Sequence, residues 1–220
     1  MSVAPADLVR RVEALAEELP AGVRAEVRSE AAALAAYLAA LAAANESVNL
    51  VSAAAAQPAE LAGRHLRESL EGLPLLPPLG RCLTLLDLGS GGGFPALPLL
   101  LVRRDIKGTL IESTGKKARF LSEVCRELSL TVTVWNVRFP DSFPMTHSSR
   151  FDVLTSRAVA DAGKLVRRAR PLLRKGGRAL LWTTEALFPG IRRASGCGES
   201  AFHKSSAGES RGIAVLESFT

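Results

Sequence analysis

The sequence predicts a doubly wound α/β fold, in which helices cover both faces of a mostly parallel sheet, and two observations lead to that prediction. First, short apolar runs alternate with helical patterns over residues 83–182. Second, the apolar run 83–88 leads directly into a loop with Gly89, Gly91 and Gly93. A strand followed by a glycine loop and a helix forms a nucleotide site at the carboxyl end of a parallel strand.

Ahead of this domain the sequence predicts a helical cap over residues 1–72, packed on the sheet domain. Apolar residues at helical spacing indicate a first helix over residues 5–19, a second from Val23 to Ala44 and a third from Pro58 to Leu70. A proline-rich linker then leads into the sheet domain, which we place at residues 80–194.

After the glycine loop the alternation of strands and helices continues. Two helices are expected at 114–129 and 161–173, and further strands at 107–111, 130–135, 151–154 and 178–182. The last residues, 195–220, are rich in Gly and Ser, so we expect a loose tail that ends in a short strand at 212–217.

Composition narrows the class of protein. A chain of 220 residues with 47% hydrophobic residues can build one α/β core and a smaller addition. No apolar run approaches the length of a membrane span, and no secretory signal is visible. Three scattered cysteines predict free thiols in a reducing cytoplasm rather than a zinc site. The net charge of +6 indicates a polyanionic partner such as a nucleic acid.

Three kinds of nucleotide site are possible for the glycine loop. A phosphate loop is disfavoured because no Gly-Lys-Ser/Thr element follows. A dinucleotide site remains formally open, since Gly91, Gly93 and Ala96 satisfy G-x-G-x-x-A. However, Asp87 at the end of the strand would lie beside the ligand, where a carboxylate suits a cationic sulfonium better than a pyrophosphate. Glu112, which ends the second strand, is placed to accept hydrogen bonds from ribose hydroxyls.

Several motifs between residues 30 and 182 identify a family. They are Asn45-Glu46 with Asn49-Leu50, Arg64-His65 with Glu68-Ser69, the loop from Asp87 to Pro95, Ile111-Glu112-Ser113 with Lys116-Lys117, Ser156-Arg157-Ala158, and Gly176-Gly177. In these motifs the chain resembles the bacterial 16S rRNA guanine-N7 methyltransferases, also called the glucose-inhibited division protein B family. Phe94-Pro95 together with Ser156-Arg157-Ala158 makes the resemblance specific, because a glycine loop alone is shared by many enzymes.

The resemblance implies a class I S-adenosylmethionine-dependent methyltransferase that methylates N7 of one guanine in the decoding-region loop of 16S rRNA. Family contacts to S-adenosylmethionine fall on Gly89, Phe94, Phe139, Pro140 and Arg157, to which the glycine-loop analysis adds Asp87, Gly91 and Glu112. Guanine N7 carries a lone pair and no proton, so we assign no general base. The implied partner is 16S rRNA or the small ribosomal subunit, with no metal or membrane, and we expect a cytoplasmic monomer.

Three residues are candidates to face the substrate: Asn49, His65 and Arg138. His65 could stack on RNA or contact a phosphate, but a structural role is equally open. Arg157 follows a strand at the mouth of the sheet, where a side chain faces the ligand crevice, and the alternative for it is a surface salt bridge.

The chain departs from the family pattern at three places. Arg138-Phe139-Pro140 lacks the usual acidic residue, which leaves a backbone contact there and makes Asp141 the candidate replacement. Trp182-Thr183-Thr184 stands where a lysine is usual, and the tail after Ser195 implies shortened final strands. Two alternative functions therefore stay open: a catalytically impaired relative that binds rRNA without modifying it and, less favoured, an NAD-dependent oxidoreductase.

Overall fold

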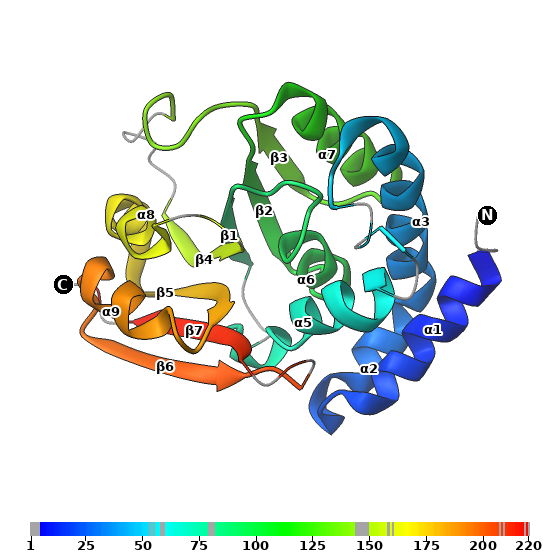
Figure 1. Ribbon diagram of the computed structural model, residues 1–220, viewed down its shortest axis with the longest axis horizontal. Coiled ribbons are helices and arrows are strands. Elements are labelled where there is room, and N and C mark those ends of the chain that lie inside the picture. The colour runs from blue at the N-terminus through cyan, green and yellow to red at the C-terminus, as the bar shows by residue number, and fades with distance from the viewer. Residues whose placement is uncertain are drawn as a thin grey trace.

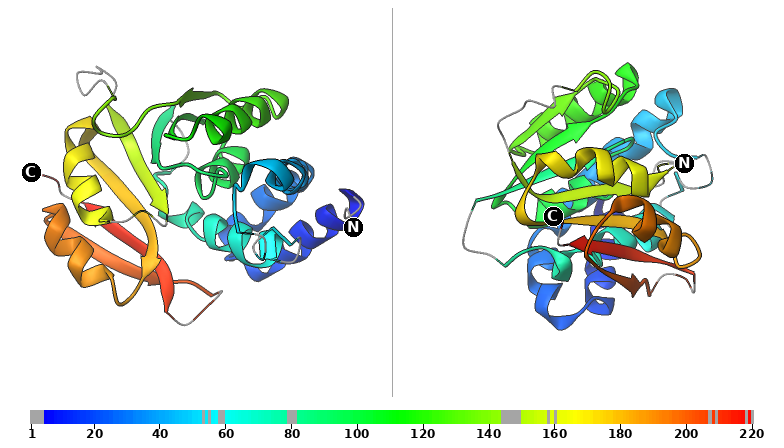
Figure 2. Two further views of the ribbon diagram at one scale, coloured as in Figure 1. Left: turned by 45° about the horizontal axis from the view of Figure 1, so that its top comes forward. Right: turned by 90° about the vertical axis from the view of Figure 1, so that its left-hand side faces the viewer.

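The computed structural model describes residues 5–52, 54, 56–57, 60–78, 82–143, 150–157, 159, 161–206, 208, 210–217 and 219. Its centre is one seven-stranded sheet with strand order β3-β2-β1-β4-β5-β7-β6. The strands are β1 Leu83–Leu88, β2 Ile106–Ile111, β3 Val132–Trp135, β4 Phe151–Arg157, β5 Leu173–Thr184, β6 Glu199–Lys204 and β7 Arg211–Glu217. Figures 1 and 2 show helices on both faces of this sheet. The predicted doubly wound α/β fold is confirmed.

Strands β1 to β5 run parallel, and only the last two strands introduce antiparallel pairs. The chain passes from β1 outward through β2 to β3 and then returns to pair β4 with the other side of β1. The strand order therefore reverses between β1 and β4. In such sheets, ligands bind in the crevice outside the carboxyl ends of the strands at this reversal.

The sheet separates two hydrophobic cores, because successive side chains of a strand point to opposite faces. Leu85 contributes to one core and Leu86 to the other. The first core is covered by the N-terminal helices together with α6 Ala96–Val102 and α7 Gly115–Glu127. The second is covered by α8 Ala162–Ala169 and α9 Phe188–Ser195, with the 3₁₀ turn η3 Arg170–Leu172 between α8 and β5.

The N-terminal helices pack directly on the first core and share it with the sheet. They are α1 Pro5–Glu18, α2 Ala21–Ser29, α3 Ala31–Val48, the π-helical turn η1 Leu61–Leu66, α5 Arg67–Leu70 and the 3₁₀ turn η2 Leu73–Leu75. The single helix predicted from Val23 to Ala44 is wrong, because the backbone turns at Glu30 (φ −101°, ψ 10°) and starts a new helix. Pro58, the predicted start of the third helix, lies outside the described residues.

One helix of the cap passes a test of length and hydropathy for membrane spans. Helix α3 is long and apolar enough to pass that test by length and composition. In the structure, however, its Leu34, Tyr37, Leu38 and Leu41 are completely buried in the first core. The helix therefore contributes its apolar face to the packing of the cap on the sheet.

The C-terminal residues form two strands, so the predicted final strand at 212–217 is confirmed as β7, whereas the prediction of a loose tail before it is wrong. β7 pairs antiparallel with β5, from Ala179↔Leu216 to Thr184↔Arg211, and β6 pairs antiparallel with β7. Because β6 is an edge strand with polar and small residues, it lacks the apolar pattern that marks a buried strand. Phe202 anchors β6 by packing on Phe188 of α9, with ring centroids 5.5 Å apart.

Candidate active site

A cavity of about 800 Å³ lies at the carboxyl ends of the parallel strands. Its floor comes from the glycine loop after β1 and from the last residues of β2, β4 and β5. The start of β7 and the cap elements η1 and α5 form its walls, and Arg211 of β7 contacts Glu68 of α5 there. The cavity therefore occupies the crevice where the strand order reverses, and its volume suits a nucleotide-sized ligand.

The glycine loop leaves the backbone open to a ligand. Gly89 and Gly91 adopt positive φ angles of 74° and 56°, which residues with a Cβ rarely adopt. Among the described residues, a Cβ built on Gly91 would meet only the carbonyl oxygen of Gly89, at 3.8 Å, so they leave the space above Gly91 open. The backbone can thus approach a bound molecule closely at this point.

Glu112 holds the glycine loop in place and also faces the cavity. Its Oε2 accepts a hydrogen bond from the Gly91 backbone N–H at 2.8 Å, and its Oε1 accepts one from Thr114 N–H at 2.7 Å. Each carboxylate oxygen can accept a second hydrogen bond. The carboxylate therefore retains acceptor positions for the hydroxyl groups of a ligand.

Asp87 lies beneath the glycine loop and, among the described residues, is not one of those that line the cavity. β1 directs the Asp87 side chain into the protein, where it is 1% exposed, and a contact between Asp87 and a ligand stays a prediction. Its Oδ1 accepts a 2.6 Å hydrogen bond from Thr155, whereas its Oδ2 is buried and has no partner among the described residues. Burial raises the pKa of the Asp87 carboxyl to about 7.

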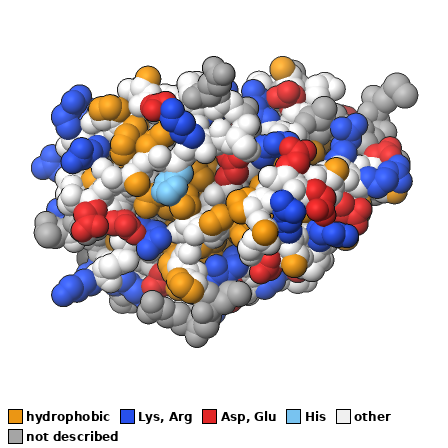
Figure 3. Space-filling view, turned by 90° about the horizontal axis from the view of Figure 1, so that it is seen from below, with side chains coloured by type: hydrophobic (Ala, Val, Ile, Leu, Met, Phe, Trp, Pro, Cys, Tyr) orange, Lys and Arg blue, Asp and Glu red, His pale blue; other side chains and the backbone are white. Residues whose placement is uncertain are grey.

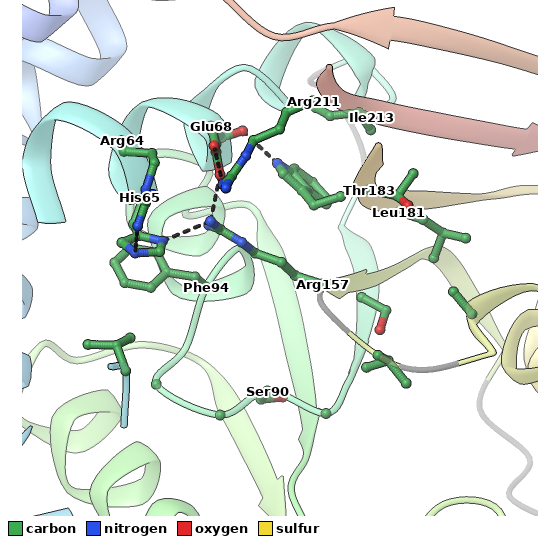
Figure 4. A pocket seen from close by; sticks show the side chains of 18 of the residues that line it. Arg64, His65, Glu68, Ser90, Phe94, Arg157, Leu181, Thr183, Arg211 and Ile213 are labelled. Carbon is green, nitrogen blue, oxygen red and sulfur yellow. Dashed lines mark hydrogen bonds and ion pairs between the residues drawn. The ribbon is translucent and has the colours of Figure 1, made fainter. Parts of the chain in front are cut away.

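Phe94, His65 and Arg157 form one contiguous wall of the cavity (Figure 4). The His65 ring stacks on the Phe94 ring with centroids 5.4 Å apart, and the Arg157 guanidinium carbon lies 6.0 Å from the Phe94 centroid. His65 Nδ1 lies 2.8 Å from Arg157 Nη2. Burial, assisted by the charges of Arg157, Arg64 and Arg211, lowers the pKa of His65 to about 3. The imidazole is therefore neutral at pH 7, and its Nδ1 accepts the hydrogen bond from Arg157.

Glu68 connects this wall to the far side of the cavity. Its Oε2 is 2.5 Å from Arg157 Nη2 and its Oε1 is 3.2 Å from Arg211 Nη1. The Arg157–Glu68 pair is buried, with side chains 13% and 6% exposed, so the surface salt bridge proposed as the alternative for Arg157 is wrong. Burial lowers the pKa of Arg157, while the Glu68 carboxylate opposes that shift. Arg157 Nη1 is buried without a partner among the described residues.

The structure brings five of the predicted site residues together at this cavity and at its wall: Gly89, Gly91, Phe94, Glu112 and Arg157, with His65 beside them. Phe139 and Pro140 line a different cavity, of about 660 Å³, beside α8. They lie there because the loop after β3 turns toward α8 rather than toward the glycine loop. Ala158, the third residue of the Ser-Arg-Ala motif, lies outside the described residues.

Two substrate-facing candidates lie outside the cavity lining given by the described residues. Arg138 is exposed in the loop after β3, and only its backbone carbonyl forms a hydrogen bond, which Ser142 N–H donates. Asn49 is exposed and ends α3 in a left-handed conformation (φ 50°, ψ 54°). The following residue, Leu50, does line the cavity.

Among the residues that the prediction missed, Glu68 and Arg211 line the cavity, and Tyr37 contacts the glycine loop. Glu68 lies one helical turn after Arg64 and His65, so the Arg-His-x-x-Glu spacing placed it on the same face. Arg211 begins β7, and no local pattern links it to β5, although it pairs with Thr184 in the sheet. Tyr37 comes from α3 and donates a hydrogen bond to the Gly92 carbonyl at 2.9 Å, a contact over 55 residues of sequence.

Solved structures share this fold. A fibrillarin/Nop5p complex matches with a TM-score of 0.57 at 15% identity and covers 71% of this chain and 83% of that chain. A 16S rRNA methyltransferase of T. Thermophilus, solved in complex with AdoMet and guanosine, matches with a TM-score of 0.53 at 19% identity and covers 79% of this chain and 45% of that chain. At such low identities the likeness establishes the fold alone, which is that of these methyltransferases.

Relatives found by sequence match at higher identity than these solved structures. Proteins named ribosomal RNA small subunit methyltransferase G match from Sorangium cellulosum, at 41% identity over 62% of this chain and 57% of that protein, and from Roseiflexus castenholzii, at 36% identity over 68% and 63%. The chain thus spans less than two thirds of the length of these relatives. The family model described as GidB, rRNA small subunit methyltransferase G, matches residues 30–193. Because that match covers most of the 220 residues, the chain belongs to the GidB family of rRNA small subunit methyltransferase G proteins.

Proposed function

We propose that this chain transfers a methyl group from S-adenosylmethionine to N7 of a guanine in the decoding-region loop of 16S rRNA. The observation that carries the proposal is the cavity at the strand reversal, where the glycine loop and Glu112 lie on one side and Arg157, Arg211 and Trp182 on the other. Membership of the GidB family supports the substrate class. We further propose that the protein acts in the cytoplasm, as a monomer, on rRNA or the small subunit.

The glycine-loop side of the cavity fits S-adenosylmethionine. The open space above Gly91 admits the flat and flexible parts of the molecule, and Glu112 keeps acceptor positions for ribose hydroxyls. The Asp87 carboxyl lies behind the cavity lining and carries a buried oxygen without a partner among the described residues. When bound, S-adenosylmethionine supplies a methyl group on a cationic sulfur.

The residues of this chain contribute position and electrostatics to the reaction. Guanine N7 carries no proton, so no base is needed to remove one. The task of the protein is to hold N7 in line with the methyl carbon and the sulfur of S-adenosylmethionine. Phe94 and the neutral His65 present a flat wall, and Arg157 Nη1 offers a buried donor for an acceptor of either bound molecule. The N7 edge is inaccessible inside an A-form helix, so the target guanine must lie in a loop or turn outward.

A specific observation favours an active enzyme over an impaired relative. The impaired alternative arose because Thr183 and Thr184 replace a basic segment. Arg211, however, pairs with Thr184 across the β5–β7 ladder and lines the same cavity. The cavity thus keeps a cation at the place where the sequence of β5 lacks one.

Calorimetry tests the cofactor class independently of activity. The purified chain should bind S-adenosylmethionine with a measurable heat, and NAD under the same conditions should give none. Binding of NAD in preference to S-adenosylmethionine would instead support the oxidoreductase alternative. A Glu112→Gln variant should weaken S-adenosylmethionine binding, because an amide accepts ribose hydrogen bonds less strongly than a carboxylate.

Mass spectrometry of 16S rRNA tests the reaction. RNA from a strain without this gene should lack one N7-methylguanosine in the decoding-region loop, and purified protein should restore it. Arg157→Ala should lower this activity at least tenfold, whereas Arg11→Ala, on the exposed face of α1, should leave it unchanged. If the deletion strain keeps its N7-methylguanosine, the proposed reaction is wrong. If Arg157→Ala keeps full activity, Arg157 does not belong to the site.

A further inference from the structure

The basic charge of the chain is concentrated in one segment. Residues 161–195 contain nine Lys and Arg against two Asp and Glu, a net charge of +7, while the whole chain carries +6. The net charge of all other residues is therefore −1. The segment includes α8 and α9, which lie side by side over the second core. A field of one sign on one part of a protein attracts partners of the opposite sign.

The exposed cations of these two helices are mostly unpaired. They are Lys164, Arg167 and Arg168 of α8 and Arg192 and Arg193 of α9, and we call them the α8–α9 basic surface. In the described part of the chain, only Lys164 forms an ion pair, with Asp161 at 3.4 Å and with both side chains about 70% exposed. The four arginines have no carboxylate partner there. Figure 3 shows Lys and Arg gathered along the upper left edge of the molecule, whereas basic and acidic side chains intermingle on the right.

Close helix packing brings the two groups of cations together. A Cβ built on Gly163 of α8 would lie 2.6 Å from the carbonyl oxygen of Ile191 in α9, so the two backbones touch at this point. Val166 and Ile191 fill the core beneath the contact. The helices therefore form a rigid support, and the arginines project from neighbouring turns of it.

The basic surface also adjoins both cavities. Ala162, the first residue of α8, lines the cavity of the proposed reaction. Lys164, Arg167 and Arg168 border the second cavity together with Phe139 and Pro140. From Ala162 to Arg168 the helix rises about 9 Å, at about 1.5 Å per residue. A polymer with one unit in the reaction cavity thus meets the cations of α8 within its next few units.

We propose that the α8–α9 basic surface binds the phosphate backbone of the RNA strand whose guanine enters the reaction cavity. This inference rests on the proposed function and adds the surface along which the substrate lies. Arginine suits the role because its guanidinium binds phosphate oxygens in a bidentate manner. The Phe139 ring, at the border of the second cavity, offers a face on which a neighbouring unpaired base stacks.

The test compares two double variants that lose the same charge. Arg167→Gln/Arg168→Gln removes two cations of the basic surface. Arg11→Gln/Arg126→Gln removes two exposed arginines of α1 and α7 that form no ion pair among the described residues and lie away from α8 in Figure 1. For each protein we would measure binding to protein-free 16S rRNA and to small subunits over a range of salt concentrations, together with KM and kcat for methylation.

The α8 variant, Arg167→Gln/Arg168→Gln, should bind RNA at least tenfold more weakly than the unsubstituted protein. Its KM should rise, whereas its kcat should stay within about twofold. The slope of log K against log salt should fall in magnitude by about 1.4 to 1.8, because each of the two lost phosphate contacts lowers it by about 0.7 to 0.9. The control variant should change each quantity less than twofold. Equal effects of the two double variants, or an unchanged salt slope, would overturn the proposed surface.

Two other outcomes are distinguishable from these. If the α8 variant weakens binding to small subunits but not to protein-free RNA, the surface binds a ribosomal protein and the RNA proposal is wrong. If the parent protein binds and methylates no RNA, the proposed function itself fails. S-adenosylmethionine binding, measured by calorimetry, should be the same in all three proteins and verifies that the variants are folded.

Discussion

Replacing Glu68 by glutamine tests how the cavity wall is held together. The carboxylate is 6% exposed and contacts Arg157 Nη2 at 2.5 Å and Arg211 Nη1 at 3.2 Å. Glutamine keeps the shape of the side chain but removes its charge. Arg157, which is 13% exposed, then remains in the wall without its counter-ion. We therefore expect a loss of stability that reflects a buried cation rather than a lost surface contact.

The magnitude follows from the burial of each pair. Removing one partner of a buried ion pair costs about 3–5 kcal/mol, because the remaining charge stays desolvated. The Arg211 pair adds less than about 1 kcal/mol, since the Arg211 side chain is 46% exposed and water screens it. His65 still accepts a hydrogen bond from Arg157 at 2.8 Å and relieves part of the loss. We expect Glu68→Gln to lower the free energy of unfolding by about 3 kcal/mol.

Urea unfolding of a double-mutant cycle measures this interaction. The cycle combines Glu68→Gln with Arg157→Gln, and the two effects should fall short of additivity by about 2 kcal/mol. Glu60→Gln is the matched control, because Glu60 precedes the same helical segment and pairs with Arg64 at 3.2 Å while 46% exposed. Its cost should stay below about 1 kcal/mol. The reasoning is refuted if the cycle is additive within about 0.5 kcal/mol, or if Glu68→Gln costs no more than the control.

Three further predictions concern Asp87, Tyr37 and Gly163. Burial raises the Asp87 pKa from 3.8 to about 7, so the folded protein keeps a proton that the unfolded chain releases, and stability falls as the pH rises between these values. Urea unfolding of Asp87→Asn should show a stability gain over wild type that grows to about 4 kcal/mol by pH 8, and a gain independent of pH would contradict this. Tyr37→Phe should cost about 1–2 kcal/mol by the same assay, because the Gly92 carbonyl loses its 2.9 Å hydrogen bond, and an unchanged midpoint would count against that bond. Gly163→Ala should cost about 1–3 kcal/mol by forcing α8 and α9 apart, whereas Gly190→Ala, with open space around its Cβ, should not destabilise; equal effects would disprove the close packing.

The sequence was sufficient for the parallel part of the fold, because these strands leave strong local patterns. The run Leu83–Leu88 is apolar and ends at glycines, so both the strand and its loop were predictable. The edge strand Glu199–Lys204 was not predicted, because its residues are small or polar and only pairing with β7 makes it a strand. Glu30 likewise resembles any helical residue, and the turn there depends on how α2 and α3 pack.

The site was predictable where its residues follow strand ends. Gly89, Glu112 and Arg157 each follow or end a parallel strand, so the topology alone brings them to one crevice. Glu68 and Arg211 come from the cap and from an antiparallel strand, and their contact spans 143 residues of sequence. No local pattern encodes such a pair. The direction of the loop at Phe139 and Pro140 is likewise not encoded locally, since it depends on contacts with the distant α8.

The unpaired polar atoms around the reversal of strand order explain why this crevice is a site rather than a packed core. Asp87 Oδ2 on β1 and Arg157 Nη1 on β4 are buried without partners among the described residues, and each such atom costs about 1–3 kcal/mol. A sequence selected for stability alone would favour apolar residues at both positions, such as the leucines that occupy most of β1. Because Arg157 lines the cavity, a ligand with an anionic group offsets the cost of its unpaired Nη1 when it binds, and S-adenosylmethionine carries a carboxylate. The loss of stability in the free protein is thus recovered only in the complex, as expected where binding and not folding has selected the residues.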